Sequence, residues 1–168
     1  MANTYTLIES QVLGSSAASV TFSAIPATYT DLVLRVSART DADDTSLITF
    51  NGITTSYSIT RLNGNGATAT STRSSSAVSI AARGMNNATG TTANTFSNAE
   101  VYIPSYTVSQ NKPLSSFGTP EDNATNVFMS VGASLWQNAA AITSINLAAQ
   151  GGNYVTGSAF YLYGIKNS

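Results

Sequence analysis

Hydrophobic and polar residues alternate along much of this chain with the two-residue period of a β-strand. One run places Val20 and Phe22 on one face and hydroxyl side chains on the other. The next run places Leu32, Leu34 and Val36 together on one face. The same pattern predicts strands at residues 19–23, 31–37, 47–50, 57–62, 77–82, 99–103, 126–136 and 145–149.

Two stretches carry more apolar residues than simple alternation needs. Residues 159–165 are apolar on both faces, which predicts a central strand covered on both sides. Gly132 lies within residues 126–136 and is typical of a bend or bulge in a strand. Every second residue of that stretch is apolar, and we call these residues its apolar parity: Val127, Met129, Val131, Ala133 and Leu135.

Turn residues separate the predicted strands. Asn51-Gly52 and the two glycine-rich stretches at residues 63–66 and 151–153 supply residues that tolerate positive φ, as tight turns require. Pro26 and Pro104 end strands, because proline has no N–H to donate to a sheet. The turns therefore delimit many short strands.

Helical spacing is scarce, and residues 135–141 are the one stretch that favours a helix, of one or two turns. About eight to eleven short strands predict an all-β fold: a single-domain antiparallel β-sandwich, jelly-roll-like, over residues 1–168. Residues 64–95 have few bulky side chains and are the least decided part. They are either edge strands joined by a long exposed loop or a mobile, loop-rich excursion that becomes ordered against a partner.

The alternation also predicts which side chains form the core. We expect the inward faces of the strands to supply Val20, Phe22, Leu32, Leu34, Val36, Val101, Ile103 and Leu162. The phenylalanines are expected to fill the same core: Phe22, Phe50, Phe96, Phe128 and Phe160.

Composition narrows the possible functions. The chain has no cysteine and no histidine, which excludes disulfides, thiolate metal sites and Ser-His or Cys-His catalysis. Charged residues make up 9% of the chain, and the formal net charge is −1. The seven basic residues do not cluster, so no nucleic-acid partner is expected. No apolar run is long enough for a membrane span and the N-terminus lacks secretory features, so no membrane partner is expected either. We expect a non-enzyme with no cofactor.

One acidic cluster is a candidate for metal binding. Asp41, Asp43 and Asp44 lie within four residues and offer oxygen ligands for Ca²⁺. The EF-hand pattern is absent, and a solvated loop between strands is the simpler interpretation. Glu121-Asp122 forms a second, weaker acidic pair.

Paired carboxylates are also what glycoside hydrolysis needs. The chain offers Glu9, Asp31, Glu100 and the 121–122 pair, but no spacing selects two of them. The glycine-rich turns do not match nucleotide-binding patterns. No catalytic, cofactor-binding or metal-binding residue is therefore assigned from the sequence.

Aromatic residues are the remaining candidates for binding, because exposed rings stack on sugars. The alternative is that the tyrosines lie at the rim of the core with their hydroxyl groups in water, which is common. The residues concerned are Tyr102, Tyr106, Trp136, Tyr154, Tyr161 and Tyr163.

Three segments of the sequence are informative when they are taken together. The first comprises Thr4-Tyr5-Thr6-Leu7-Ile8 and residues 20–32, Val-Thr-Phe-Ser-Ala-Ile-Pro-Ala-Thr-Tyr-Thr-Asp-Leu. The second is residues 98–106, Asn-Ala-Glu-Val-Tyr-Ile-Pro-Ser-Tyr, with Asn111-Lys112-Pro113. The third comprises residues 141–147, 152–154 and 162–166. Together these segments resemble small virion proteins of tailed bacteriophages. The likeness spans most of the chain and departs most at residues 41–44 and 64–95.

The resemblance implies a structural function in the virion, assembled in the host cytoplasm. On that basis we expect a capsid decoration or cement protein that binds the major capsid protein lattice as a homotrimer. The alternative is a fibre-tip or receptor-binding module that recognises host surface glycans. The low charge suits either, because a near-neutral protein is poorly protected against self-association.

Overall fold

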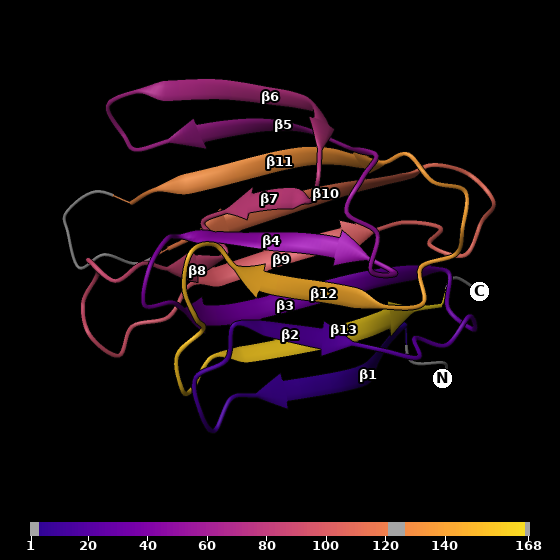
Figure 1. Cartoon of the computed structure of the whole chain (residues 1–168), viewed down its shortest axis with the longest axis horizontal. Coiled ribbons are helices and arrows are strands. Elements are labelled where there is room, and N and C mark those ends of the chain that lie inside the picture. Colours follow the sequence, from indigo (N-terminus) through magenta and orange to yellow (C-terminus); the bar gives the residue numbers. More distant parts are fainter. Residues whose placement is uncertain (1–3, 121–126, 167–168) are drawn as a thin grey trace.

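The structure, a computed structural model, describes residues 4–120 and 127–166 of the 168-residue chain. These residues form thirteen strands and no helix (Figure 1). The strands are β1 (Tyr5–Val12), β2 (Ser19–Phe22), β3 (Asp31–Arg39), β4 (Thr45–Phe50), β5 (Tyr57–Gly64), β6 (Ala69–Ala77), β7 (Ile80–Arg83), β8 (Asn86–Asn87), β9 (Asn98–Ile103), β10 (Lys112–Thr119), β11 (Met129–Trp136), β12 (Ile145–Ala149) and β13 (Ala159–Ile165). The all-β prediction is confirmed.

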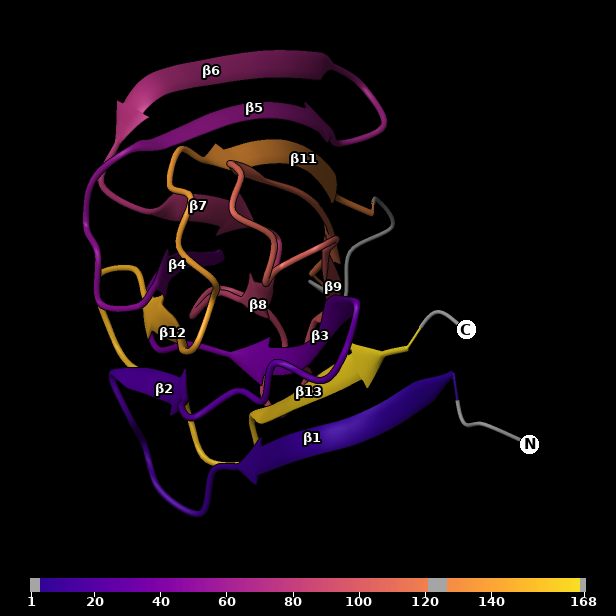
Figure 2. The same ribbon diagram turned by 90° about the vertical axis from the view of Figure 1, so that its right-hand side faces the viewer.

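The strands form two sheets that face each other as a β-sandwich. The larger sheet has nine strands, in the order β1-β13-β3-β9-β10-β11-β5-β6, with the short β8 pairing parallel to β3. All other pairs in it are antiparallel. The smaller sheet is antiparallel, in the order β2-β12-β4-β7. In Figure 2 the larger sheet curves from β1 at the bottom to β6 at the top, and the smaller sheet lies within the curve. Jelly-roll connectivity stays a prediction.

The core lies between the two sheets, where the alternation predicted it. Leu34 on β3 and Leu162 on β13 are opposite each other in the larger sheet, and Leu147 and Ile48 are opposite each other in the smaller one. All eight side chains predicted from the alternation as core residues are buried. β13 is an interior strand flanked by β1 and β3, but Tyr161 and Tyr163 on one of its faces are only half-buried, so the expectation of full cover on both faces is wrong.

Residues 64–95 are more ordered than the loop-rich interpretation suggests. Residues 69–77 form β6, an exposed edge strand, as one of the two interpretations predicted. Ile80 and Ala82 belong to the core. Asn86 and Asn87 are fully buried. The loop-rich interpretation of residues 64–95 is therefore wrong for these four residues.

The helix predicted at residues 135–141 is absent. Leu135 and Trp136 end β11, and the following residues are irregular. The reason is tertiary: the buried Lys112 donates hydrogen bonds from Nζ to the carbonyl oxygens of Gln110, Asn138 (3.4 Å) and Ala139 (3.5 Å). Those carbonyl groups serve as partners for a buried cation, whose pKa is lowered by burial.

The bulge that was one of the two predictions for Gly132 is absent too. Gly132 pairs in regular register with Ser116 on one side and Arg61 on the other. The glycine instead allows close packing, because a Cβ atom there would lie 2.4 Å from Ser116 Oγ. The register shifts lie elsewhere, in β1 between Leu7 and Glu9 and in the β5–β6 pair.

Candidate functional site

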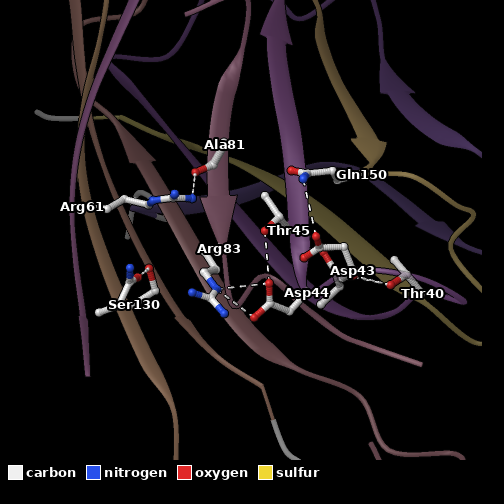
Figure 3. Close-up of polar contacts among 11 residues, drawn as sticks. Thr40, Asp43, Asp44, Thr45, Arg61, Ala81, Arg83, Ser130 and Gln150 are labelled. Carbon is white, nitrogen blue, oxygen red and sulfur yellow. Dashed lines mark hydrogen bonds and ion pairs between the residues drawn. The ribbon is translucent and has the colours of Figure 1, made fainter. Parts of the chain in front are cut away.

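The acidic cluster of the β3–β4 connection lies beside the end of β7 and the loop after β12 (Figure 3). Asp41 Oδ1 accepts a hydrogen bond from the backbone N–H of Asn153 at 2.7 Å. Gly152 packs closely against this carboxylate, because a Cβ atom there would lie 2.3 Å from Asp41 Oδ1. The Asp41 carboxylate therefore holds two loops together.

The other two carboxylates of the cluster have different partners. Asp44 forms an ion pair with Arg83 at 3.0 Å, and it also accepts a hydrogen bond from the hydroxyl group of Thr45 at 3.1 Å. Asp43 Oδ2 accepts a hydrogen bond from Gln150 at 3.4 Å. Figure 3 shows Gln150 above Asp43 and Arg83 beside Asp44.

The protonation equilibria of Asp43 and Asp44 differ in direction. Burial raises the pKa of Asp44, and its hydrogen bond to Asp43 raises it further against the opposing effect of Arg83. Burial also acts to raise the pKa of Asp43, but hydrogen bonds from Asp44 and Thr45 and the charge of Arg83 outweigh it, so that this pKa is lowered. A proton taken up by the pair is therefore favoured on Asp44.

The three aspartates are not arranged as a metal site. Within residues 4–120 and 127–166, no group of three or more acidic side chains has a geometry that suits a metal ion. Each carboxylate is instead held by a neighbour of its own. The second acidic pair, Glu121-Asp122, lies outside the described residues. The solvated-loop interpretation fits Asp41 and Asp43 better than Asp44, which is more deeply buried.

The environment of the Asp41 carboxylate predicts how the stability of the fold depends on pH. Its pKa is lowered from 3.8, chiefly by the hydrogen bond from the backbone of Asn153. Because the folded-state pKa lies below the unfolded value, the stabilisation is present above about pH 4 and lost as the pH falls through the folded-state value. We expect Asp41→Asn to be less stable than the wild type at pH 7, with the difference narrowing toward pH 3. Urea denaturation at both pH values measures this, and a difference independent of pH would contradict it.

The isolated carboxylates named for hydrolysis are separately engaged. Asp31 is buried and accepts hydrogen bonds from the hydroxyl group of Tyr102 and the backbone N–H of Ser105, both at 2.8 Å. Glu100 forms an ion pair with Arg35 at 2.6 Å. Glu9 accepts a hydrogen bond from Gln11 at 2.8 Å. The structure does not bring any two of these three together in a hydrogen-bonded or ion-paired group.

The aromatic residues are distributed differently from the sequence expectation. Tyr106 and Tyr154 are fully buried, so the rim placement is wrong for these two tyrosines. Trp136 is fully buried as well, so it is not an exposed ring that could stack on a sugar. Phe96 and Phe128 are only half-buried, so their assignment to the core is also wrong. Phe22, Phe50 and Phe160 are in the core as expected. Tyr102, Tyr161 and Tyr163 are half-buried, as rim residues would be.

An apolar patch covers part of the outer face of the larger sheet. Phe117 on β10 pairs with Val131 on β11, which pairs with Leu62 on β5. These three side chains and Met129 are each 39–53% exposed, and we call them the outer patch. Glu100, which forms an ion pair with Arg35, lies opposite Phe117 in β9 and borders the outer patch. The four side chains of the outer patch are themselves uncharged.

The sequence shows which residues of β11 are apolar, but not whether they face the core or the solvent. The apolar parity of residues 126–136 faces solvent, while Ser130, Gly132, Ser134 and Trp136 face inward. Ser130 is accommodated there because it donates a hydrogen bond to Asn63 at 2.8 Å. The alternate apolar residues of this stretch are the feature of the sequence from which the surface could have been found.

Comparisons of the chain with protein-family models, with curated proteins and with solved structures find no match. Among the described residues, no helix is long and apolar enough to cross a membrane.

Proposed function

We propose that this chain is a non-enzymatic virion structural protein: a capsid decoration or cement protein that binds the major capsid protein lattice as a homotrimer. The outer patch is the observation that carries the proposal. It places four large apolar side chains on one sheet face, bordered by Glu100 and its ion pair with Arg35. Exposed apolar groups of this kind mark surfaces that are covered in the functional state.

The edges of the larger sheet support the same proposal. β6 is fully unpaired on one side, and its nine residues include a single charged residue, Arg73. Edge strands of monomeric proteins are commonly protected by charged residues. A weakly protected edge next to a neutral patch suits a protein packed against copies of itself and against a lattice. A closed ring of three subunits would cover such surfaces, and the resemblance of the sequence to phage virion proteins favours it.

The proposal is tested by light scattering and by sedimentation with capsids. The expected mass is three times 17.4 kDa, unchanged by raised salt because the contacts are neutral. The chain is also expected to sediment with capsids of its phage that have been stripped of it. A 17.4 kDa monomer at low and high salt that does not bind capsids would overturn the proposal.

A pair of matched variants tests whether the outer patch is the contact surface. Val131→Glu places a charge in the patch, whereas Val108→Glu places one at a similarly exposed valine in the loop between β9 and β10. We expect Val131→Glu to reduce trimer formation or capsid binding at least about tenfold, because burying an unpaired carboxylate is costly. Val108→Glu is expected to leave both unchanged. If the two variants had equal effects, the outer patch would not be the contact surface.

The fibre-tip alternative has less support from the observations. Its sugar-binding loops would need exposed aromatic rings, and Tyr106, Trp136 and Tyr154 are buried. It predicts binding to the surface of host cells and none to stripped capsids, so the same sedimentation experiment separates the two functions.

A further inference from the structure

β6 is an edge strand that the rest of the described chain leaves uncovered. It pairs with β5 on one side, and no described strand lies on its other side (Figures 1 and 2). Eight of its nine residues, from Ala69 to Ser76, are exposed. The exposure has a simple cause, because the larger sheet extends beyond the last strand of the smaller one. Both faces of β6 and its free edge are therefore available to a second molecule.

The turn before β6 shows which backbone groups reach the free edge. The N–H of Asn65 donates to the carbonyl oxygen of Thr68 at 3.3 Å, so these two residues form a hydrogen-bonded pair at the end of the β5–β6 hairpin. Hydrogen-bonded and non-hydrogen-bonded pairs alternate along an antiparallel ladder. The register shift of this hairpin lies further along β6. The N–H and C=O groups of Ala69, Ser71 and Arg73 therefore point away from β5.

The sequence of β6 favours a second copy of β6 as the occupant of this edge. Its residues are alanine, serine and threonine, with the single charge of Arg73 at the centre. A two-fold axis through Ser71 places Arg73 opposite Ala69 of the second copy, and the two arginines lie about 14 Å apart along the strands. An axis through Arg73 would place the like charges directly opposite each other, which is unfavourable. The charge therefore selects the register centred on Ser71.

The same register continues the outer patch across the contact. Successive cross-strand neighbours from β10 to β6 form one row: Phe117, Val131, Leu62 and Ser71. With Ser71 on the two-fold axis, this row runs on through the same four residues of the second copy in reverse order. The outer patches of the two copies then lie on one continuous sheet surface, separated by two serines.

We propose that β6 pairs antiparallel with β6 of a second copy, about a two-fold axis through Ser71, so that the larger sheets of two subunits become one sheet. The two Ser71 residues exchange both backbone hydrogen bonds, and so does Ala69 of each copy with Arg73 of the other. β1, the other edge of the larger sheet, is a poorer partner. Its register shift between Leu7 and Glu9 interrupts the regular spacing of its edge groups.

This contact differs from one that closes a ring of three. A two-fold contact joins two subunits, so in the proposed trimer it would join a subunit of one trimer to a subunit of the next. As a statement about trimers on a capsid, the inference rests on the proposed function. Water-exposed hydrogen bonds with few apolar contacts give a weak association of free subunits. A lattice that holds trimers side by side strengthens it through a high effective concentration.

Disulfide trapping tests the register, because the chain has no cysteine of its own. In a hydrogen-bonded antiparallel pair the Cα atoms are about 5.5 Å apart, within the range of a disulfide. Under mild oxidation we expect Ser71→Cys to form a disulfide-linked dimer at least about tenfold faster than Ala69→Cys. The control cysteine has the same strand, face and edge, but lies about 14 Å from its own copy. A mixture of Ala69→Cys and Arg73→Cys is expected to cross-link quickly, although neither does so alone.

Charge substitutions at Ala69 test the same register by a second route. A glutamate there would face Arg73 of the second copy, and two such pairs form by symmetry. In a chain that also carries Ser71→Cys, Ala69→Glu is expected to speed cross-linking about fivefold at low salt, and Ala69→Lys to slow it by a similar factor. Amide hydrogen exchange at Ser71 and Arg73 is expected to slow as the protein concentration rises.

The outcomes separate this inference from the proposed function. Equal cross-linking of Ser71→Cys and Ala69→Cys, or equal effects of glutamate and lysine at position 69, would overturn the β6 contact. Preferential cross-linking through Ser71→Cys in a chain that is otherwise monomeric and does not bind capsids would overturn only the proposed function. Trimers that bind capsids without preferential cross-linking would overturn only the β6 contact.

Discussion

Replacing Trp136 with alanine is expected to lower the free energy of unfolding by about 3–5 kcal/mol. Trp136 is fully buried at the end of β11, with its ring stacked on Tyr57 at 6.4 Å and tilted against Phe50 at 5.4 Å. Tyr57 is itself held in place, because its hydroxyl group donates to the carbonyl of Ile53 and accepts from the N–H of Phe50, both at 2.9 Å. The surrounding rings therefore cannot close over the cavity that truncation creates.

Trp136→Phe is the matched control for this prediction. It keeps an aromatic ring in the cluster and removes the indole N–H, the buried side-chain donor for which no partner exists among the described residues. We expect a loss of less than about half that of the alanine variant. The chain has a single tryptophan, so unfolding in urea is followed by far-ultraviolet circular dichroism instead of fluorescence. Equal losses for the two variants would show that ring packing is not the source of the stability.

Strands were predictable where one face is apolar and the other polar. β2 and β3 bury alternate residues such as Phe22 and Leu34, so the two-residue period is visible in the sequence. β10 was missed because its inward positions include Lys112, Ser116 and Gly118, which do not form an apolar face. Gly118 is needed for close approach, since a Cβ atom there would lie 2.6 Å from the carbonyl oxygen of Gly84. Such a contact joins residues far apart in the chain and leaves no periodic signal.

The candidate surfaces were predictable only in part. The apolar parity of residues 126–136 was visible, but whether it faces the core depends on what lies opposite in the other sheet. Arg61 appeared in the sequence as one of several scattered arginines. Its position beside β7, where it donates to the carbonyl of Ala81 at 2.9 Å, follows from the overhang of β5 and β6 beyond β7, which is a property of two sheets of unequal width. Local pattern cannot supply that information.

Buried polar residues are the clearest limit of the sequence reasoning, and Asn86 is the leading case. Its Oδ1 accepts a hydrogen bond from Ser46 at 2.8 Å, and its Nδ2 donates to Thr40 at 3.2 Å and to the carbonyl of Asp43. Ser46 in turn accepts a hydrogen bond from Tyr154 at 2.7 Å, and burial raises the pKa of this tyrosine. The network connects β4 and β8 to the acidic β3–β4 connection, although a short run of asparagines in the sequence is typical of a loop.

Asn86→Leu is expected to lower the free energy of unfolding by about 3 kcal/mol, although the side chains are similar in size. The leucine would leave Ser46 without its acceptor and Thr40 without this donor, while the carbonyl of Asp43 would keep only the hydrogen bond from Thr40. Each buried polar group left unpaired costs about 1–3 kcal/mol. Asn146→Leu is the matched control, because it removes one exposed hydrogen bond, to Thr21 at 2.8 Å, and should cost less than about 1 kcal/mol. Urea unfolding compares the two. If the two variants lost equal stability, the polar network would not be what holds the acidic connection against the sandwich.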